Sequence, residues 1–246
     1  MTDISELNAG LNELTIPVDF WWRDDDCGRP DPRLTRLLGM SADLDLPLAL
    51  AVVPAWLDGA VAEVIRAAEQ VTVVQHGWEH ADHATPGARK IELGGVVDVD
   101  WLSNRLLRGR VKLERQFGPR FLPVIVPPWN RASPGFVERM DSLGYEGLSA
   151  WPSLATPGLA SAVIRRDAHV DPITWWPTPR YVGLPDLVSR VLTLIRAEHV
   201  GPIGLLSHHL VFDELMFADW ARLLTLLRQH RNSRLLSPTA AFGEML

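Results

Sequence analysis

The sequence predicts an α/β protein with a mainly parallel sheet, either a closed barrel or an open sheet. Short apolar segments alternate with amphipathic helical segments along the chain, which is typical of βαβ units. Polar clusters follow the apolar segments at their C-terminal ends, where the loops of a barrel of this kind form the active site. One site is therefore expected where these clusters converge: residues 24–26, 76–83, 127–131 and 208–209.

The first half of the chain is predicted to hold four strands and three helices. Asp31 is a good N-cap and Pro32 suits the first helical position, so a helix is expected to begin there. Val61, Val64, Ile65 and Ala68 follow helical spacing. The strands are expected at 16–22, 48–53, 71–74 and 121–126, the other two helices at 58–69 and 99–117, and a glycine-containing loop at 85–95.

The second half is predicted to be less regular. Ser133 and Pro134 are expected to cap a helix that ends at Gly144, with Phe136, Val137, Met140 and Leu143 on its apolar face. Residues 151–183 are rich in proline and tryptophan and are expected to form short strands and loops around a site. A helix at 187–195, a strand at 202–206 and a long helix at 214–230 complete the expected elements.

Length, composition and charge narrow the class of protein. A chain of 246 residues that is 47% hydrophobic suits one domain spanning residues 1–246. A net charge of -6 gives no reason to expect nucleic acid or an anionic membrane as a partner. One cysteine excludes an internal disulfide, and the start of the sequence lacks the features of a signal peptide, so a cytoplasmic location is expected. The oligomeric state is not predicted.

Residues 75–83 contain three histidines and two carboxylates. On a helical turn His76 and His80 would face one side and could bind one ion, and a third ligand is expected within residues 24–26. Two imidazoles and one carboxylate leave a metal open to substrate, so a catalytic divalent ion is expected, zinc first and other transition metals as alternatives. A histidine pair at this spacing is more often structural when it stands alone.

Five segments, in chain order, resemble the motifs of the polysaccharide deacetylases with a NodB homology domain, also called carbohydrate esterase family 4. The first ends in two aspartates, which are similar to Asp25-Asp26 or, one residue earlier, to Asp24-Asp25. The second resembles His76-Gly77-Trp78-Glu79-His80, and the fifth resembles Leu206-Ser207-His208.

The third and fourth motifs are matched with substitutions. Val126-Pro127-Pro128-Trp129 is similar to the third motif, but Val126 stands where the family has an arginine that orients the base. Arg131, Arg23 or Arg166 is expected to replace it, or catalysis is altered. Asp171-Pro172-Ile173-Thr174-Trp175 resembles the fourth motif, with Thr174 where a second aspartate is common.

The resemblance implies a distorted (β/α) barrel that hydrolyses an N- or O-acetyl group from a sugar or glycoconjugate. The roles it implies are Asp25 as base, His208 as acid, Asp26, His76 and His80 as metal ligands, Pro128, Trp129, Trp175 and Leu206 at the substrate, and Asp171 and Arg131 as supporting residues. Asp171 is expected either to orient His208 or to act only as a turn residue before Pro172. His83 and His209 are expected outside the ligand set, at the surface or in support.

Two other functions compete with this one. The same metal site could act on another carbon–nitrogen bond, as a deformylase or a cyclic amide hydrolase does, because a fold does not determine its substrate. A sugar-binding protein with impaired catalysis is the second, suggested by Val126. A glycosidase with paired carboxylates would not explain histidines at the strand ends.

Overall fold

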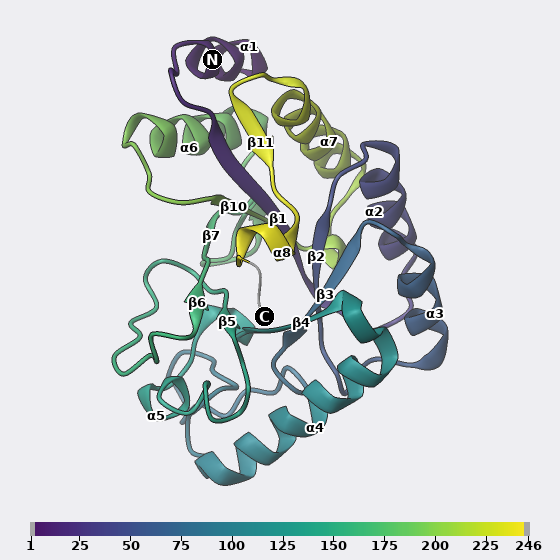
Figure 1. Ribbon diagram of the computed structural model, residues 1–246, viewed down its shortest axis with the longest axis vertical. Coiled ribbons are helices and arrows are strands. Elements are labelled where there is room, and N and C mark those ends of the chain that lie inside the picture. The colour runs from purple at the N-terminus through teal and green to yellow at the C-terminus, as the bar shows by residue number, and fades with distance from the viewer. Residues whose placement is uncertain (1–2, 244–246) are drawn as a thin grey trace.

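The computed structural model describes residues 3–243, which are arranged around one parallel sheet (Figure 1). The strand order is β6-β5-β4-β3-β2-β1-β10-β7, and β11 pairs with the start of β1. The bounds are β1 (Val18–Cys27), β2 (Leu48–Val52), β3 (Val71–His76), β4 (Phe121–Val126), β5 (Gly147–Leu148), β6 (Ile164–Arg165), β7 (Ala168–Val170), β10 (Ile203–Ser207) and β11 (Ser233–Leu235). A separate antiparallel pair is formed by β8 (Ile173–Thr174) and β9 (Arg180–Tyr181).

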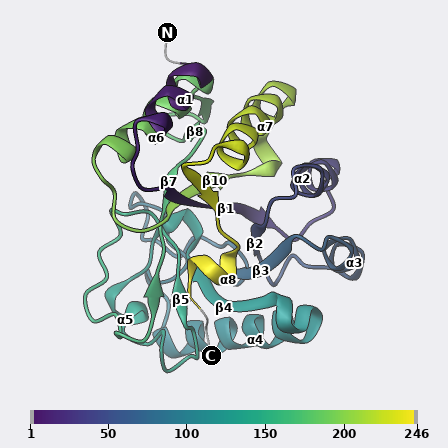
Figure 2. The same cartoon turned by 45° about the horizontal axis from the view of Figure 1, so that its top comes forward.

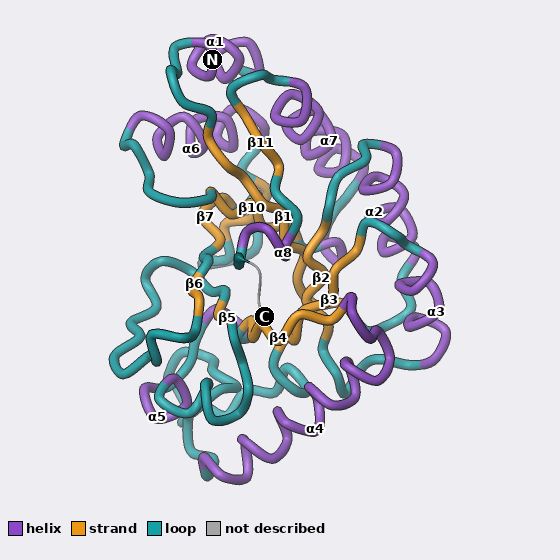
Figure 3. The backbone as a smooth tube through the Cα atoms, viewed as in Figure 1, coloured by secondary structure: helices purple, strands orange, loops and turns teal. Residues whose placement is uncertain are grey.

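The sheet curls so that its two ends come together. Its end strands, β6 and β7, are separated in the chain only by Arg166 and Asp167. The backbone N–H of Ala168 donates to the carbonyl of Ala150, just beyond β5, at 2.8 Å. The predicted distorted (β/α) barrel is therefore confirmed, and Figure 3 shows α2, α3, α4, α6 and α7 around the outside of the curled sheet.

Helices cover the outside of the sheet in two groups. Figure 2 shows α2, α3 and α4 along the side formed by β2, β3 and β4, whereas α1, α6 and α7 lie together beyond β1 and β10. The helix bounds are α1 (Ile4–Asn12), α2 (Pro32–Asp43), α3 (Gly59–Ala67), α4 (Val99–Phe117), α5 (Pro134–Val137), α6 (Leu184–Arg196), α7 (Glu214–Gln229) and α8 (Pro238–Ala241). Among residues 3–243, none of these helices has the length and apolarity that a membrane crossing requires.

Side chains of β1 alternate between an outer and an inner core. Phe20 and Trp22 pack outward in the large cluster that the helices cover. Trp21 points inward, and Phe242 packs against it edge to face at 5.5 Å between ring centroids. This alternation decides which polar side chains at the end of β1 reach the inside of the barrel.

The predicted elements agree with the structure wherever the local pattern is strong. The expected bounds 99–117 and 121–126 match α4 and β4, and Asp31 caps α2 by accepting the N–H of Arg33. α1, β11 and α8 were not predicted. In α3, Val64 is 42% exposed, so its expected place on the apolar face is wrong.

Two expected bounds differ from the structure by more than three residues. β1 was expected to end at residue 22 but extends to Cys27, because the polar residues at its end pair with strands on both sides. The helix that Ser133 caps ends at Val137 and continues as turns to Gly144. Met140 and Leu143 are still buried, as the helical spacing predicted.

Candidate active site

A cavity of about 300 Å³ lies at the C-terminal ends of β1, β3 and β10. Its walls bring together five ionisable residues from the motifs: Asp25, Asp26, His76, His80 and His208. Trp129, Asn130, Arg131 and Trp175 complete the lining. Segments separated by more than 180 residues in sequence thus meet at one site.

The backbone of β1 determines which of its three aspartates reach the cavity. Asp24 continues the outward alternation from Trp22 and is fully buried, whereas Asp25 faces inward. Alternation would turn Asp26 outward again, but the register with β2 shifts between Asp24 and Cys27, and Asp26 has a φ of 68°. This irregularity brings Asp26 into the cavity beside Asp25. Of the two pairs left open by the sequence, Asp25-Asp26 is the one that lines the cavity.

Three side chains form an arrangement suited to a metal ion. Oδ1 of Asp26 lies 3.1 Å from Nε2 of His76 and 3.1 Å from Nε2 of His80. Nδ1 of His76 donates to the carbonyl of Val126 at 3.0 Å; the carbonyl can only accept, so Nδ1 carries the proton and Nε2 is left as the ligand atom. One carboxylate and two imidazoles converging in this way fit a divalent cation.

Electrostatics at this cluster keep the carboxylate ionised. Burial raises the pKa of Asp26, but hydrogen bonds from His76 and His80 outweigh it and hold the pKa well below its usual value. Burial lowers the pKa of His76, but the nearby Asp25 and Asp26 outweigh it and raise that pKa. Asp26 therefore keeps the negative charge that a carboxylate ligand needs.

The expected helical turn between the two histidines is wrong. His76 is the last residue of β3, and His80 lies on an irregular loop with a φ of 57°. Gly77 has a φ of 55°, and a Cβ there would lie 2.0 Å from Oε2 of Glu92. Glycine therefore lets the chain turn back so that both imidazoles reach Asp26.

Glu92 holds this turn and was missed in the sequence. Its Oε1 accepts the backbone N–H of Trp78 at 3.1 Å and of Glu79 at 2.8 Å. Burial raises its pKa, and the side chain is fully buried. Glu92 lies in the loop predicted at 85–95, where no local pattern distinguishes a buried glutamate from an exposed one. His83 also supports this loop, with Nδ1 2.9 Å from the Glu92 carbonyl.

The arginine that pairs with Asp25 is Arg23, two residues earlier on the same strand. Nε of Arg23 lies 2.8 Å from Oδ1 of Asp25, and its Nη2 donates to Oδ2 at 3.0 Å. The guanidinium also donates to Ser149 Oγ and to Oδ1 of Asn130, and it is fully buried. Val126 lies in the inner core. The arginine contact with Asp25 therefore comes from Arg23 and not from position 126.

Within residues 3–243, neither of the other two candidate arginines contacts Asp25. Arg131 lines the cavity, but its Nη1 donates to the carbonyl of Lys90 at 3.0 Å. Arg166 donates from Nε to the carbonyl of Ala241 at 2.7 Å. The expected support of Asp25 by Arg131 is therefore not what the structure shows.

If Asp25 acts as a catalytic base, replacing Arg23 with lysine should lower kcat by about 10- to 100-fold, the usual effect of losing a residue that orients a catalytic group. An ammonium cannot reproduce the two contacts with the Asp25 carboxylate. The metal affinity should change little, because Arg23 contacts none of the three candidate ligands in the structure. Arg166→Lys is the matched control, and equal losses of kcat in both variants would contradict the assignment.

His208 lies beside Asp25, with 4.0 Å between its Nε2 and Oδ2 of the aspartate. The Trp175 ring packs edge-on against the imidazole, with 4.8 Å between centroids. Asp171 accepts hydrogen bonds from Trp175 Nε1 at 2.8 Å and from the N–H of Ile173 at 2.7 Å. Among residues 3–243 no hydrogen bond joins Asp171 to His208, so Asp171 positions Trp175, which in turn contacts the histidine.

Asp24 and His209 form a buried ion pair beneath the cavity. Asp24 accepts hydrogen bonds from Ser207 Oγ at 2.6 Å, from the N–H of His209 at 3.0 Å and from Nδ1 of His209. Both side chains are fully buried, so of the two positions expected for His209 the surface is excluded and the supporting one remains. These contacts join the ends of β1 and β10 and thereby fix the backbone on either side of His208.

His209→Phe should lower the free energy of unfolding by about 3 to 5 kcal/mol, because it leaves the Asp24 carboxylate buried without its partner. Burial lowers the pKa of His209, but Asp24 outweighs it and raises that pKa above 6.5. The stabilisation from protonation is therefore complete below about pH 6.5 and is lost as pH rises through the raised pKa. Urea denaturation should show the variant approaching the wild type as pH rises.

The double variant Asp24→Leu with His209→Phe tests the cause of that loss. Removing both charges should restore part of the stability, since the penalty comes from one unpaired buried charge. A His209→Phe defect that does not change with pH, and that the second substitution does not relieve, would contradict the ion pair.

The predicted substrate residues fall into two groups. Trp129 and Trp175 line the cavity, and the Trp129 ring packs 4.4 Å from the His80 ring. Trp129 and Asn130 have φ values of 54° and 55°, so the chain turns sharply after Pro128 to place both side chains. Pro128 and Leu206 are buried and are not part of the lining.

Comparisons with known proteins identify the fold. Neither a protein-family model nor a curated protein matches the sequence. A family 4 acetyl xylan esterase from Clostridium thermocellum, in complex with a cobalt ion, has a TM-score of 0.59 at 15% identity, over 92% of this chain and 90% of that one. A family 4 carbohydrate esterase from Streptomyces lividans, in complex with acetate, has a TM-score of 0.57 at 14% identity, over 92% and 96%.

A pseudoenzyme of the same family is also similar. The pseudoenzyme, from Bacillus anthracis, has a TM-score of 0.60 at 14% identity, and the match covers 94% of this chain and 66% of the pseudoenzyme. The chain described here therefore has the fold of the family 4 carbohydrate esterases, a fold found in active enzymes and in a pseudoenzyme alike.

Proposed function

We propose that this protein is a divergent polysaccharide deacetylase, a metal-dependent hydrolase that removes an N- or O-acetyl group from a sugar or glycoconjugate. The observation that supports it most is the convergence of three groups on one cavity. Asp26, His76 and His80 offer ligand atoms, Asp25 is held by Arg23, and His208 lies beside Asp25. A binding site alone would not need a base and an acid next to a metal site.

A metal ion bound at this site would act as a Lewis acid. A divalent ion held by Asp26, His76 and His80, zinc first, would polarise the acyl carbonyl and acidify water. The structural neighbour with a cobalt ion supports a divalent ion in this fold. The hydrogen bond from Nδ1 of His76 to the Val126 carbonyl fixes the tautomer of the ring, which leaves Nε2 to bind the metal.

Asp25 is proposed to take the proton of the attacking water. Arg23 contacts both carboxylate oxygens, so the carboxylate keeps its orientation without serving as a ligand. His208 is proposed to give a proton from Nε2 to the departing amine or alcohol. Trp175 packs against His208 and restricts its ring, which keeps Nε2 near Asp25.

Catalytic turnover is favoured over sugar binding alone. The binding alternative was motivated by the missing arginine at Val126, and Arg23 now pairs with Asp25. A substrate screen distinguishes acetylated sugars from other amides, because the fold does not determine the substrate. We further propose a cytoplasmic location, because the sequence has one cysteine and no disulfide. A small precursor, a lipid-linked sugar or a nucleotide sugar would then be the natural substrate.

A substrate screen tests the proposed function. Purified protein, with its metal content measured by elemental analysis, is incubated with acetylated sugars, formamides and cyclic imides. The products are quantified: acetate, formate and the ring-opened half-amide, respectively. Acetate release from sugars that stops after chelation and returns with added zinc or cobalt is expected. Activity only on formamides or cyclic imides, or no divalent ion bound even on titration, would contradict the proposal.

A further inference from the structure

A second cavity, of about 460 Å³, adjoins the candidate active site. Trp129, Asn130, Arg131 and Trp175 line both cavities, so the two are continuous. A sugar whose acyl group lies between Asp25 and His208 has this second cavity as its neighbour. Its lining therefore bears on which substituents the rest of the substrate carries.

The charged lining of the second cavity is mainly positive. It contains Arg89, Arg131 and Arg190, against the single carboxylate of Asp171. That carboxylate already accepts two hydrogen bonds, from Ile173 and Trp175. The excess of positive charge is a property of this cavity lining, whereas the whole chain has a net charge of -6.

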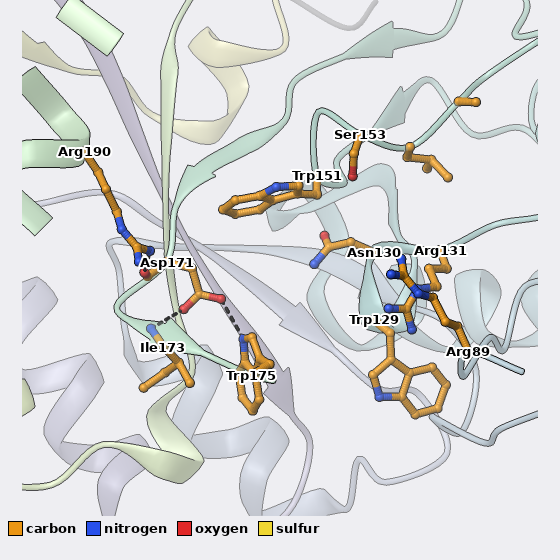
Figure 4. Close-up of a pocket in the computed structure, with 12 residues that line it drawn as sticks. Arg89, Trp129, Asn130, Arg131, Trp151, Ser153, Asp171, Ile173, Trp175 and Arg190 are labelled. Carbon is orange, nitrogen blue, oxygen red and sulfur yellow. Dashed lines mark hydrogen bonds between the residues drawn. The ribbon is translucent and has the colours of Figure 1, made fainter. Parts of the chain in front are cut away.

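Arg89 and Arg131 form a pair of neighbouring cations beside Trp129, at the end of the cavity away from Asp171 (Figure 4). Burial and the nearby Arg89 lower the pKa of Arg131, and Asp82 opposes this effect only in part. Within residues 3–243 neither guanidinium forms an ion pair with a carboxylate, and Arg131 donates only from Nη1, to the carbonyl of Lys90. Lys90 adds a third positive charge, 5.6 Å from the Trp129 ring centroid.

Two adjacent guanidiniums without a carboxylate repel each other, and an anion between them would remove that repulsion. Guanidinium groups bind phosphate and carboxylate oxygens through paired N–H donors, with stronger hydrogen bonds than neutral groups make. The indole rings of Trp129 and Trp151 offer flat apolar faces in the same cavity for a sugar ring.

We propose that Arg89 and Arg131 bind an anionic substituent, a phosphate or a carboxylate, so that the substrate is an acidic acetylated sugar. This inference rests on the proposed function, in which the substrate is an acetylated sugar. It goes beyond that function by assigning a binding role to two residues outside the metal site. Arg89 lies three residues before Glu92, whose side chain accepts the two backbone N–H groups of the metal-binding turn.

Binding of three sugars, measured by calorimetry, tests the proposal without depending on turnover. The probes are N-acetylglucosamine, its 6-phosphate, and N-acetylmuramic acid, which carries a carboxylate. At least one acidic sugar should bind about 10-fold or more tightly than the neutral one, and added salt should reduce the difference. The two acidic probes separate phosphate from carboxylate.

Matched variants show whether the arginine pair is responsible. Arg89→Gln with Arg131→Gln should remove the preference, whereas Arg115→Gln with Arg231→Gln makes the same change in net charge at two exposed sites and should retain it. Equal affinity for acidic and neutral sugars, no measurable binding of either, or a preference that survives in the first double variant would overturn the proposal. A preference for acidic sugars without acetate release from any sugar would contradict the proposed function alone.

Discussion

Asp25→Asn should lower kcat for acetate release by about 10²- to 10⁴-fold, the usual contribution of a positioned general base. The amide has the shape of the carboxylate but cannot accept the proton of the attacking water. The affinity for zinc or cobalt should stay close to that of the wild type, because Asp25 faces Arg23 and is not one of the three converging ligands. Steady-state kinetics and metal titration measure the two effects separately.

Asp43→Asn, at the exposed end of α2, is the control for the change of charge and should leave kcat unchanged. Circular dichroism should show both variants folded. A rate in Asp25→Asn within about twofold of the wild type would mean that a different group removes the proton.

His76→Ala and His80→Ala should each weaken metal binding by about 100-fold or more, since even residues that only support a ligand contribute 10- to 100-fold. Each substitution removes one of the nitrogens that lie 3.1 Å from Asp26 Oδ1. Competition with a chromophoric chelator measures the change in Kd, and the deacetylation rate at limiting metal should fall with it.

His83→Ala provides the comparison within the same segment. Its imidazole contacts the Glu92 carbonyl rather than Asp26, so metal affinity should change little while the loop loses some stability. If His83→Ala weakened metal binding as much as His80→Ala does, the ligand set would have to be reassigned.

The local elements of this fold could be read from the sequence because they depend on nearest neighbours. Asp31 and Pro32 at the start of α2, and the spacing along α4, are effects within a few residues. The length of β1 was underestimated because its last residues are polar. They remain in the strand since β10 and β2 pair with them, and neither partner is near in sequence.

The candidate site shows the same division between local and distant effects. The motif order placed Asp25, Asp26, His76, His80 and His208 at strand ends, and the structure brings them to one cavity. Arg23 was one of three open alternatives, and only strand alternation and burial distinguish it. Glu92 gave no signal, because its role depends on two backbone N–H groups that become unpaired when the chain turns at Gly77.

Because Arg23 and Asp25 lie on the same strand, their contact can persist when the three candidate metal ligands move apart. The proposed base, Asp25, and Arg23 are neighbours on one face of one strand, so a small movement between strands leaves their contact intact. The metal ligands come from β1 and from the end of β3, with β2 between them, and the same movement would separate them. Substitutions that loosen the packing of β2 should therefore impair metal loading well before they disturb the base, giving a protein that excess metal can rescue.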